Sequence, residues 1–207
     1  MKPTELEVLN LAREAVTSDA ILEELWHGLK AKDLAERQRC FLALQALTEA
    51  YPERMHVHYW EETAEMLDSR SIDDKYIAVS LLAGMAAAKG DTRFETLLDK
   101  YFGLLDDNSL IIPRHVALNA GRVLKAKPLF SKRILGYLLN IERTHHTPSR
   151  RALIAASALE SLDRGFEDIE DQAAVLEFAG FYAEAPSPKA QKVAREFLKR
   201  WGQTPVR

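Results

Sequence analysis

The sequence predicts an all-α protein, built as a solenoid of about five antiparallel helix pairs. A basic residue recurs at the start of an apolar, alanine-rich stretch, at spacings of 36, 39, 37 and 41 residues: Arg39, Lys75, Arg114, Arg151 and Lys192. Each follows an acidic residue by six to nine positions: Asp33, Asp68, Asp106, Glu142 and Glu184. A unit of about 40 residues forms one helical hairpin, which cannot bury its own apolar face and therefore stacks on its neighbours.

Helical periodicity places the elements in order along the chain. Thr4 caps a first helix that runs to about Val16. Pro113, Pro148 and Pro188 suit the first turn of a helix, where the missing N–H needs no partner. The predicted hairpins are residues 19–31 with 34–50, 57–67 with 74–89, 92–105 with 113–125, 131–142 with 148–162, and about 170–183 with 188–201.

These elements predict a single domain over residues 1–207, with a capping helix in 1–18, five hairpins in 19–201 and a tail in 202–207. The chain is 47% hydrophobic, which is enough for a sizeable core. Cys40 is the only cysteine, so an internal disulfide is impossible and a reducing compartment fits. The acidic N-terminus does not resemble a secretory signal, and no stretch approaches the roughly 18 apolar residues of a membrane span. We therefore expect a cytoplasmic protein that does not bind membranes.

The second helix of each hairpin is rich in small residues, and the first helix carries the bulk. Ala83, Gly84 and Ala86 illustrate the small set, and Phe94 and Tyr101 illustrate the bulky set. Small side chains permit close contact between helices. We therefore expect the alanine-rich helices to form one layer and the bulky helices the other.

This alternation resembles the HEAT-repeat family, and armadillo-like arrays share much of the pattern. The resemblance is carried by Asp68 with Lys75-Tyr76-Ile77-Ala78, by Asp106 with Arg114-His115-Val116-Ala117, and in weaker form by Asp33 with Arg39 and Glu142 with Arg151. It implies a right-handed superhelix whose second helices line a concave face that binds a partner. It implies no catalytic residues.

The recurrent charges also predict a structural ladder of hydrogen bonds and ion pairs between acidic turn residues and basic residues. Its expected members are Arg39, Asp68, Lys75, Asp106 and Arg114, with Asp68 and Asp106 meeting Lys75 and Arg114 of their own or a neighbouring unit. Such a ladder stabilises the array and needs no ligand.

Charge is distributed unevenly along the chain. Residues 1–110 hold 12 Lys and Arg against 21 Asp and Glu, whereas residues 111–160 hold 9 against 2. A positive surface in the second segment attracts an acidic protein or phosphate groups. The alternative interpretation is a solvated rim that neutralises the acidic units beside it. The residues predicted to contact a partner are Arg114, Arg122, Lys125, Arg150 and Arg151.

Catalytic and metal-binding patterns are sparse, and we expect no enzyme activity, cofactor or metal. His56 and His58 are two positions apart, which separates them on a helix, and they are interpreted as surface residues. His145-His146 lies in a predicted loop without a cysteine or clustered carboxylates. The first hypothesis is a non-catalytic scaffold or adaptor that binds a protein partner. A nucleic-acid-binding protein is the second, and an enzyme similar to HEAT-like DNA glycosylases is the third.

Overall fold

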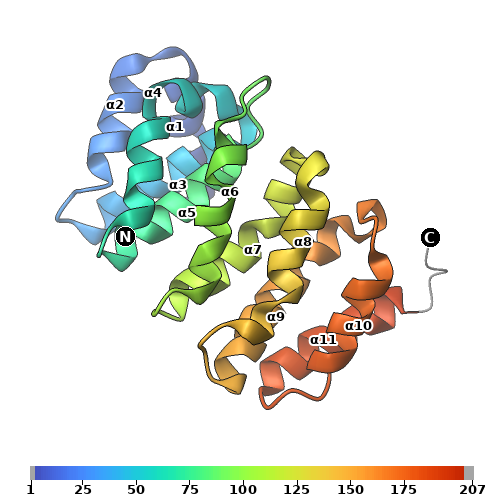
Figure 1. Ribbon diagram of the computed structural model, residues 1–207. Helices are drawn as coiled ribbons and strands as arrows, with labels where there is room; N and C mark the ends of the chain where they lie inside the picture. Colours follow the sequence, from blue (N-terminus) through green and yellow to red (C-terminus); the bar gives the residue numbers. More distant parts are fainter. Residues whose placement is uncertain (1–2, 203–207) are drawn as a thin grey trace.

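The computed structural model describes residues 3–202 and contains only helices and connecting turns in that range (Figure 1). No helix within it is long and apolar enough to cross a membrane. The helices are α1 (Glu5–Thr17), α2 (Asp19–Gly28), α3 (Leu34–Ala50), α4 (Pro52–Glu65), α5 (Ile72–Met85), α6 (Arg93–Gly103), α7 (Ile111–Ala126), α8 (Ser131–Leu139), α9 (Pro148–Leu162), α10 (Gln172–Tyr182) and α11 (Pro188–Trp201).

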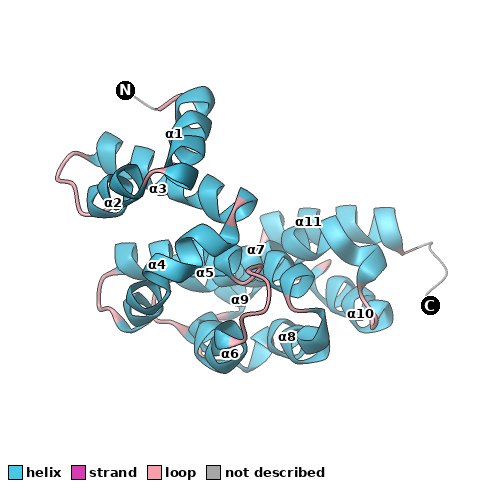
Figure 2. Ribbon diagram, turned by 90° about the horizontal axis from the view of Figure 1, so that it is seen from above, coloured by secondary structure: helices cyan, strands magenta, loops and turns pink. Residues whose placement is uncertain are grey.

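The helices form two layers, as the sequence predicts. The inner layer contains α1, α3, α5, α7, α9 and α11, each packed against the next. The outer layer contains α2, α4, α6, α8 and α10, and in Figure 2 α6, α8 and α10 lie below α7, α9 and α11. Five hairpins therefore follow an N-terminal helix, and α1 extends the inner layer by packing on α3. The all-α solenoid is confirmed.

Small residues allow the inner helices to approach one another closely. A Cβ atom built on Gly84 of α5 would lie 2.3 Å from Thr48 Oγ1 of α3. A Cβ on Gly121 of α7 would lie 2.5 Å from the Ser161 carbonyl oxygen of α9. The Gly121 N–H also donates a hydrogen bond to Ser161 Oγ at 2.7 Å. The successive inner helices are thus in backbone-level contact at these two crossings.

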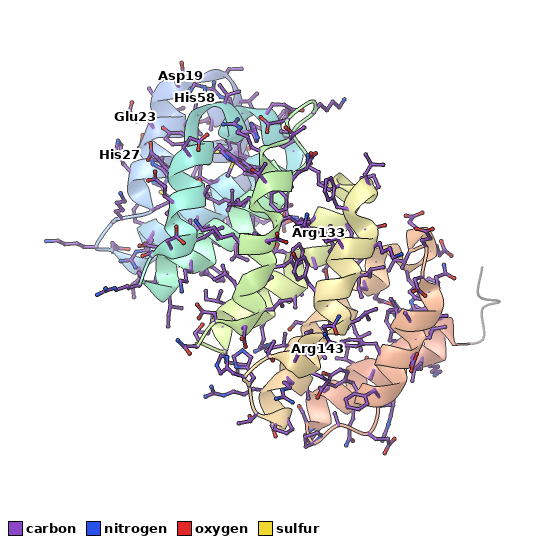
Figure 3. The ribbon with its side chains drawn as sticks, in the orientation of Figure 1. Asp19, Glu23, His27, His58, Arg133 and Arg143 are labelled. Carbon is purple, nitrogen blue, oxygen red and sulfur yellow. The ribbon has the colours of Figure 1, made fainter. Side chains whose placement is uncertain are left out.

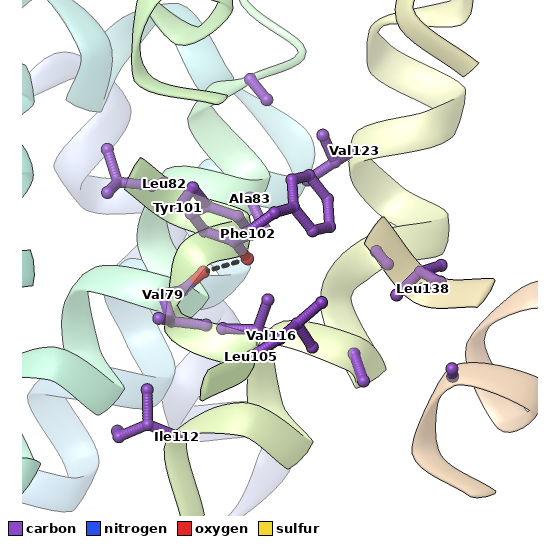
Figure 4. Close-up of a cluster of buried hydrophobic side chains, with 14 of the residues drawn as sticks. Val79, Leu82, Ala83, Tyr101, Phe102, Leu105, Ile112, Val116, Val123 and Leu138 are labelled. Atoms are coloured by element: carbon purple, nitrogen blue, oxygen red, sulfur yellow. Dashed lines mark hydrogen bonds between the residues drawn. The ribbon is translucent and has the colours of Figure 1, made fainter. Parts of the chain in front are cut away.

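Bulky residues of the outer layer fill the space between the layers (Figure 4). Tyr101 and Phe102 of α6 are buried and lie among side chains of α5, α7 and α8, including Val79, Val116 and Leu138. The Tyr101 hydroxyl donates to the Val79 carbonyl at 2.9 Å, which satisfies the one polar atom of this side chain. Burial raises the pKa of Tyr101, so the phenol stays neutral.

Two predicted boundaries differ from the structure by four residues or more. The second hairpin starts at Pro52, not at residue 57, because this proline both ends α3 and occupies the first turn of α4. Helix α5 ends at Met85 and not at residue 89. The chain then turns at Gly90, whose φ of 74° is favourable for glycine.

Substitution of Gly121 tests the close contact in the inner layer. We expect Gly121→Ala to destabilise the protein by about 1–3 kcal/mol, since the new methyl group meets the backbone of α9. Gly136→Ala is the matched control, because a Cβ on this α8 residue meets no atom within 4 Å. It should be neutral, or stabilising by up to about 1 kcal/mol. Urea unfolding of both variants measures the difference, and equal stabilities would contradict the close contact.

Candidate partner-binding surface

The solvent-facing side of α7 is a single stripe with apolar and basic side chains. Ile111, Leu118 and Lys125 are exposed and lie seven positions apart, which places them on one helix face. Arg114 and Arg122 are partly exposed between them. The structure thus brings three of the five predicted partner-binding residues, Arg114, Arg122 and Lys125, onto the same face of one inner helix.

Exposed apolar side chains also recur at the first residue of three successive inner helices. Leu34 begins α3, Ile72 begins α5 and Ile111 begins α7, with 73%, 44% and 51% of their surfaces exposed. We call these three residues the apolar row. Sequence reasoning missed it, although the members are 38 and 39 positions apart and share one place in the repeat.

An aromatic contact joins the same three helices. The Tyr76 ring of α5 lies between Phe41 of α3, at 5.2 Å between centroids, and His115 of α7, at 4.5 Å. Burial raises the pKa of Tyr76 and lowers that of His115, so both rings are favoured in the neutral form. Tyr76 therefore presents a partly exposed, uncharged ring in the middle of the inner layer.

The inner layer lies on the inside of the curve of the array. Glu49 at the end of α3 reaches Arg122 of α7, with 2.7 Å between carboxylate oxygen and guanidinium nitrogen, although α5 separates these helices in the layer. Helices two places apart can approach in this way only on the inner side of a bend.

The five basic residues predicted to contact a partner differ in whether their side chains already bond to other residues of the protein. Arg122 binds Glu49, and Arg151 donates to the Thr144 carbonyl at 3.2 Å and to Glu142 at 3.3 Å. Arg114 Nε donates to Ser157 Oγ of α9 at 3.5 Å. Lys125 and Arg150 are exposed, and neither has a side-chain hydrogen bond or ion pair within residues 3–202. Of the five residues, these two therefore have side-chain charges that are not engaged by the described part of the chain.

The rest of the basic segment partly neutralises the acidic units beside it. Lys127 Nζ binds Glu95 at 3.3 Å and the Asp91 carbonyl at 2.7 Å, and Arg133 of α8 pairs with Asp99 of α6. Figure 3 labels Arg133 in the C-terminal half of the array, and the acidic residues Asp19 and Glu23 in the N-terminal half, on α2. Lys127 and Arg133 therefore fit the alternative interpretation of the basic segment, in which its charges neutralise the acidic units beside it.

Ion pairs do join neighbouring units, but neither Asp68 nor Asp106 pairs with Lys75 or Arg114 as predicted. Lys75 binds Asp107 of the next unit at 2.6 Å. Asp68 binds Lys100, at 2.5 Å, and Asp106 binds His145.

The first inner helices carry two further ion pairs near the predicted ladder position Arg39. Arg39 pairs within its own helix with Glu36, whereas Arg37 reaches Asp73 on α5 at 3.1 Å. Adjacent residues of a turn point in different directions, so the repeat pattern locates each charged turn but does not select the residue that bonds.

The Lys75–Asp107 pair is the least exposed cross-unit ion pair near the apolar row, with 21% and 10% of the side chains exposed. Burial acts to raise the pKa of Asp107, but the hydrogen bonds from Lys75 and Ser109 and the charge of Lys75 outweigh it and lower that pKa. The carboxylate is thus held ionised between α5 and α7.

The histidines also depart from expectation. His56 is buried and not on the surface, with Nε2 at 3.2 Å from Asp91 and Nδ1 at 2.8 Å from an Arg93 guanidinium nitrogen. Burial, followed by the charge of Arg93, lowers the pKa of His56. His58 is exposed, as predicted. The loop with His145 and His146 does meet a carboxylate, because Asp106 reaches it from the preceding unit.

No protein-family model and no curated protein matches the chain. Several solved structures are similar to it, including two designed repeat proteins. A designed armadillo repeat protein has a TM-score of 0.45 and 14% identity, over 96% of this chain and 94% of that one. A computationally designed armadillo repeat protein for modular peptide recognition has a TM-score of 0.48 and 14% identity, over 93% of this chain and 90% of that one.

Removal of Lys75 tests the buried rung of the ladder. We expect Lys75→Ala to cost about 1–3 kcal/mol at pH 7, because the Asp107 carboxylate loses its partner. The folded pKa of Asp107 is lowered, so this stability is present above the ordinary carboxyl pKa of about 3.9 and is lost as the pH falls through the folded value. The difference between wild type and variant should therefore shrink in acid.

Lys100→Ala is the control for this measurement, since its partner Asp68 has 70% of its side chain exposed. A loss of about 1 kcal/mol or less is expected there. Denaturant unfolding between pH 7 and pH 3 provides the comparison. A Lys75 variant as stable as the Lys100 variant would contradict the structural role of the pair.

Proposed function

We propose that the protein is a HEAT-like, non-catalytic scaffold that binds an extended, acidic protein segment along its inner helices. The observation that carries the proposal is the apolar row, Leu34, Ile72 and Ile111, which exposes large apolar side chains at one repeat position. Exposed apolar groups that line up on a surface mark interaction sites. Repeat arrays of this kind use such extended surfaces for binding.

The spacing of the row suits an extended segment. Neighbouring packed helices are about 8–10 Å apart. An extended chain advances about 3.3 Å per residue, so roughly every third residue meets a new inner helix. The row therefore favours a segment with apolar residues at that interval.

Charge favours an acidic segment over other partners. Lys125 and Arg150 are exposed and unpaired within the described chain, and Arg114 follows Ile111 of the row by three positions on α7. A nucleic-acid surface needs a larger set of free cations along one face. Arg122 and Arg151 are instead committed to Glu49 and Glu142. The nearby carboxylates Asp73, Asp107 and Glu142 are each paired with a cation, which supports a binding role over a catalytic one.

Selection from a library of random peptides displayed on phage tests the proposal. We expect enriched sequences to carry apolar residues about three positions apart and acidic residues toward one end. The triple variant Leu34→Ser, Ile72→Ser, Ile111→Ser should bind a selected peptide at least tenfold more weakly, since each apolar contact contributes about 1 kcal/mol or more. The control is Val57→Ser with Leu129→Ser, which changes two residues that are 73% and 95% exposed outside the inner helices.

The rate at which the same peptide associates tests the role of the exposed charge on Arg150. Arg150→Glu should slow association and flatten its dependence on salt, whereas Lys132→Glu on the outer helix α8 should not. Equal binding by the triple variant and wild type would contradict the proposal. Tight binding of single-stranded DNA that competes with the peptide would instead favour the nucleic-acid hypothesis.

A further inference from the structure

The loop before α9 meets the turn after α6 at a small cluster of three side chains. Asp106 Oδ1 accepts a hydrogen bond from the His145 backbone N–H at 2.8 Å and lies 2.6 Å from His145 Nδ1. His146 packs beside His145, with 4.3 Å between the ring centroids. Residues 39 and 40 positions apart in the sequence thus form one cluster that joins the third and fourth hairpins.

His146 is the unusual member of the cluster. It is only 2% exposed, and neither ring nitrogen makes a hydrogen bond of good geometry within residues 3–202, although the Leu105 backbone lies near the ring and acts to raise its pKa. Buried polar groups in folded proteins are nearly always paired, so an unpaired buried imidazole needs an explanation. A bound cation supplies one, because a neutral imidazole nitrogen is a strong metal ligand.

The geometry points to a binding site for a divalent transition metal of the Zn²⁺ class, formed by Asp106, His145 and His146. One ligand atom from each of the three residues lies within 4.8 Å of the others. Zinc–ligand bonds of about 2.0–2.2 Å in a tetrahedron place ligand atoms roughly 3.4 Å apart. Asp106 and His145 are about half exposed, at 52% and 48%, so their side chains can close this gap while the buried His146 holds its place.

The chemistry of the donors selects the metal. His145 Nδ1 and Asp106 Oδ1 lie 2.6 Å apart, so a cation that replaces the proton between these two atoms is bound directly by both of them. Two imidazole nitrogens and one carboxylate suit Zn²⁺ or Co²⁺, whereas Mg²⁺ and Ca²⁺ prefer oxygen ligands only. Arg150 places a positive charge near His146, and the Asp106 carboxylate balances it.

The site is independent of the proposed scaffold function and predicts a stabilising link between two hairpins. The test is a Co²⁺ titration of the chelator-treated protein, residues 1–207, followed by electronic absorption. We expect one ion per chain with the spectrum of a tetrahedral site, displacement by Zn²⁺ and not by Mg²⁺, and a higher melting temperature with Zn²⁺.

Substitution of the buried His146 could prevent folding, so the test uses variants of the two exposed ligands, His145 and Asp106. His145→Ala should remove the tetrahedral spectrum and the Zn²⁺-dependent stabilisation, and Asp106→Asn should weaken binding at least tenfold. His27→Ala is the matched control, since His27 is an exposed histidine beside the carboxylate of Glu23, at 3.5 Å. Absence of a tetrahedral spectrum in the wild type, or equal Co²⁺ binding by wild type and His145→Ala, would overturn the inference.

Discussion

The structure depends on the close approach of successive inner helices. Where Gly84 meets Thr48 and Gly121 meets Ser161, there is no room for a side chain between the helices. This contact requires small residues in the inner layer, and the bulk needed to fill the core comes from the outer layer. As a result every residue of α5 from Ile77 to Met85 is buried.

The polar contacts between units follow from this packing. Trp26 donates to Glu62, Lys75 binds Asp107, and Trp201 donates to Asp163, at separations of 36, 32 and 38 residues. Each joins a side chain of one hairpin to the next hairpin. A unit is therefore completed by its neighbour in its polar contacts as well as in its apolar core.

Local signals made much of the fold predictable. Helices α3, α9 and α11 have the predicted bounds because their starts are marked by a capping aspartate or by a proline in the first turn. Pro52 misled the prediction, since the same residue ends one helix and begins another. Such a position leaves no gap of loop-forming residues to separate the two helices.

The candidate sites were less predictable, because tertiary packing decides them. The repeat pattern located the acidic turn but could not show that Asp107 faces Lys75 while Asp106 faces His145. The exposure of Leu34 and Ile72 could not be predicted either, because in the sequence both residues look like ordinary apolar helix positions that would be buried. The N-terminal edge of the inner layer then brings these features together, with the apolar row beside the loop that holds His146.

Native-state hydrogen exchange of the backbone amides tests most directly whether the inner layer joins the chain into one array. The account predicts the slowest exchange in α5, α7 and α9, with protection that falls gradually toward α1 and α2 at one end and toward α10 and α11 at the other. Two separate plateaus of protection, with a break between α5 and α7, would show two independent units and would contradict it.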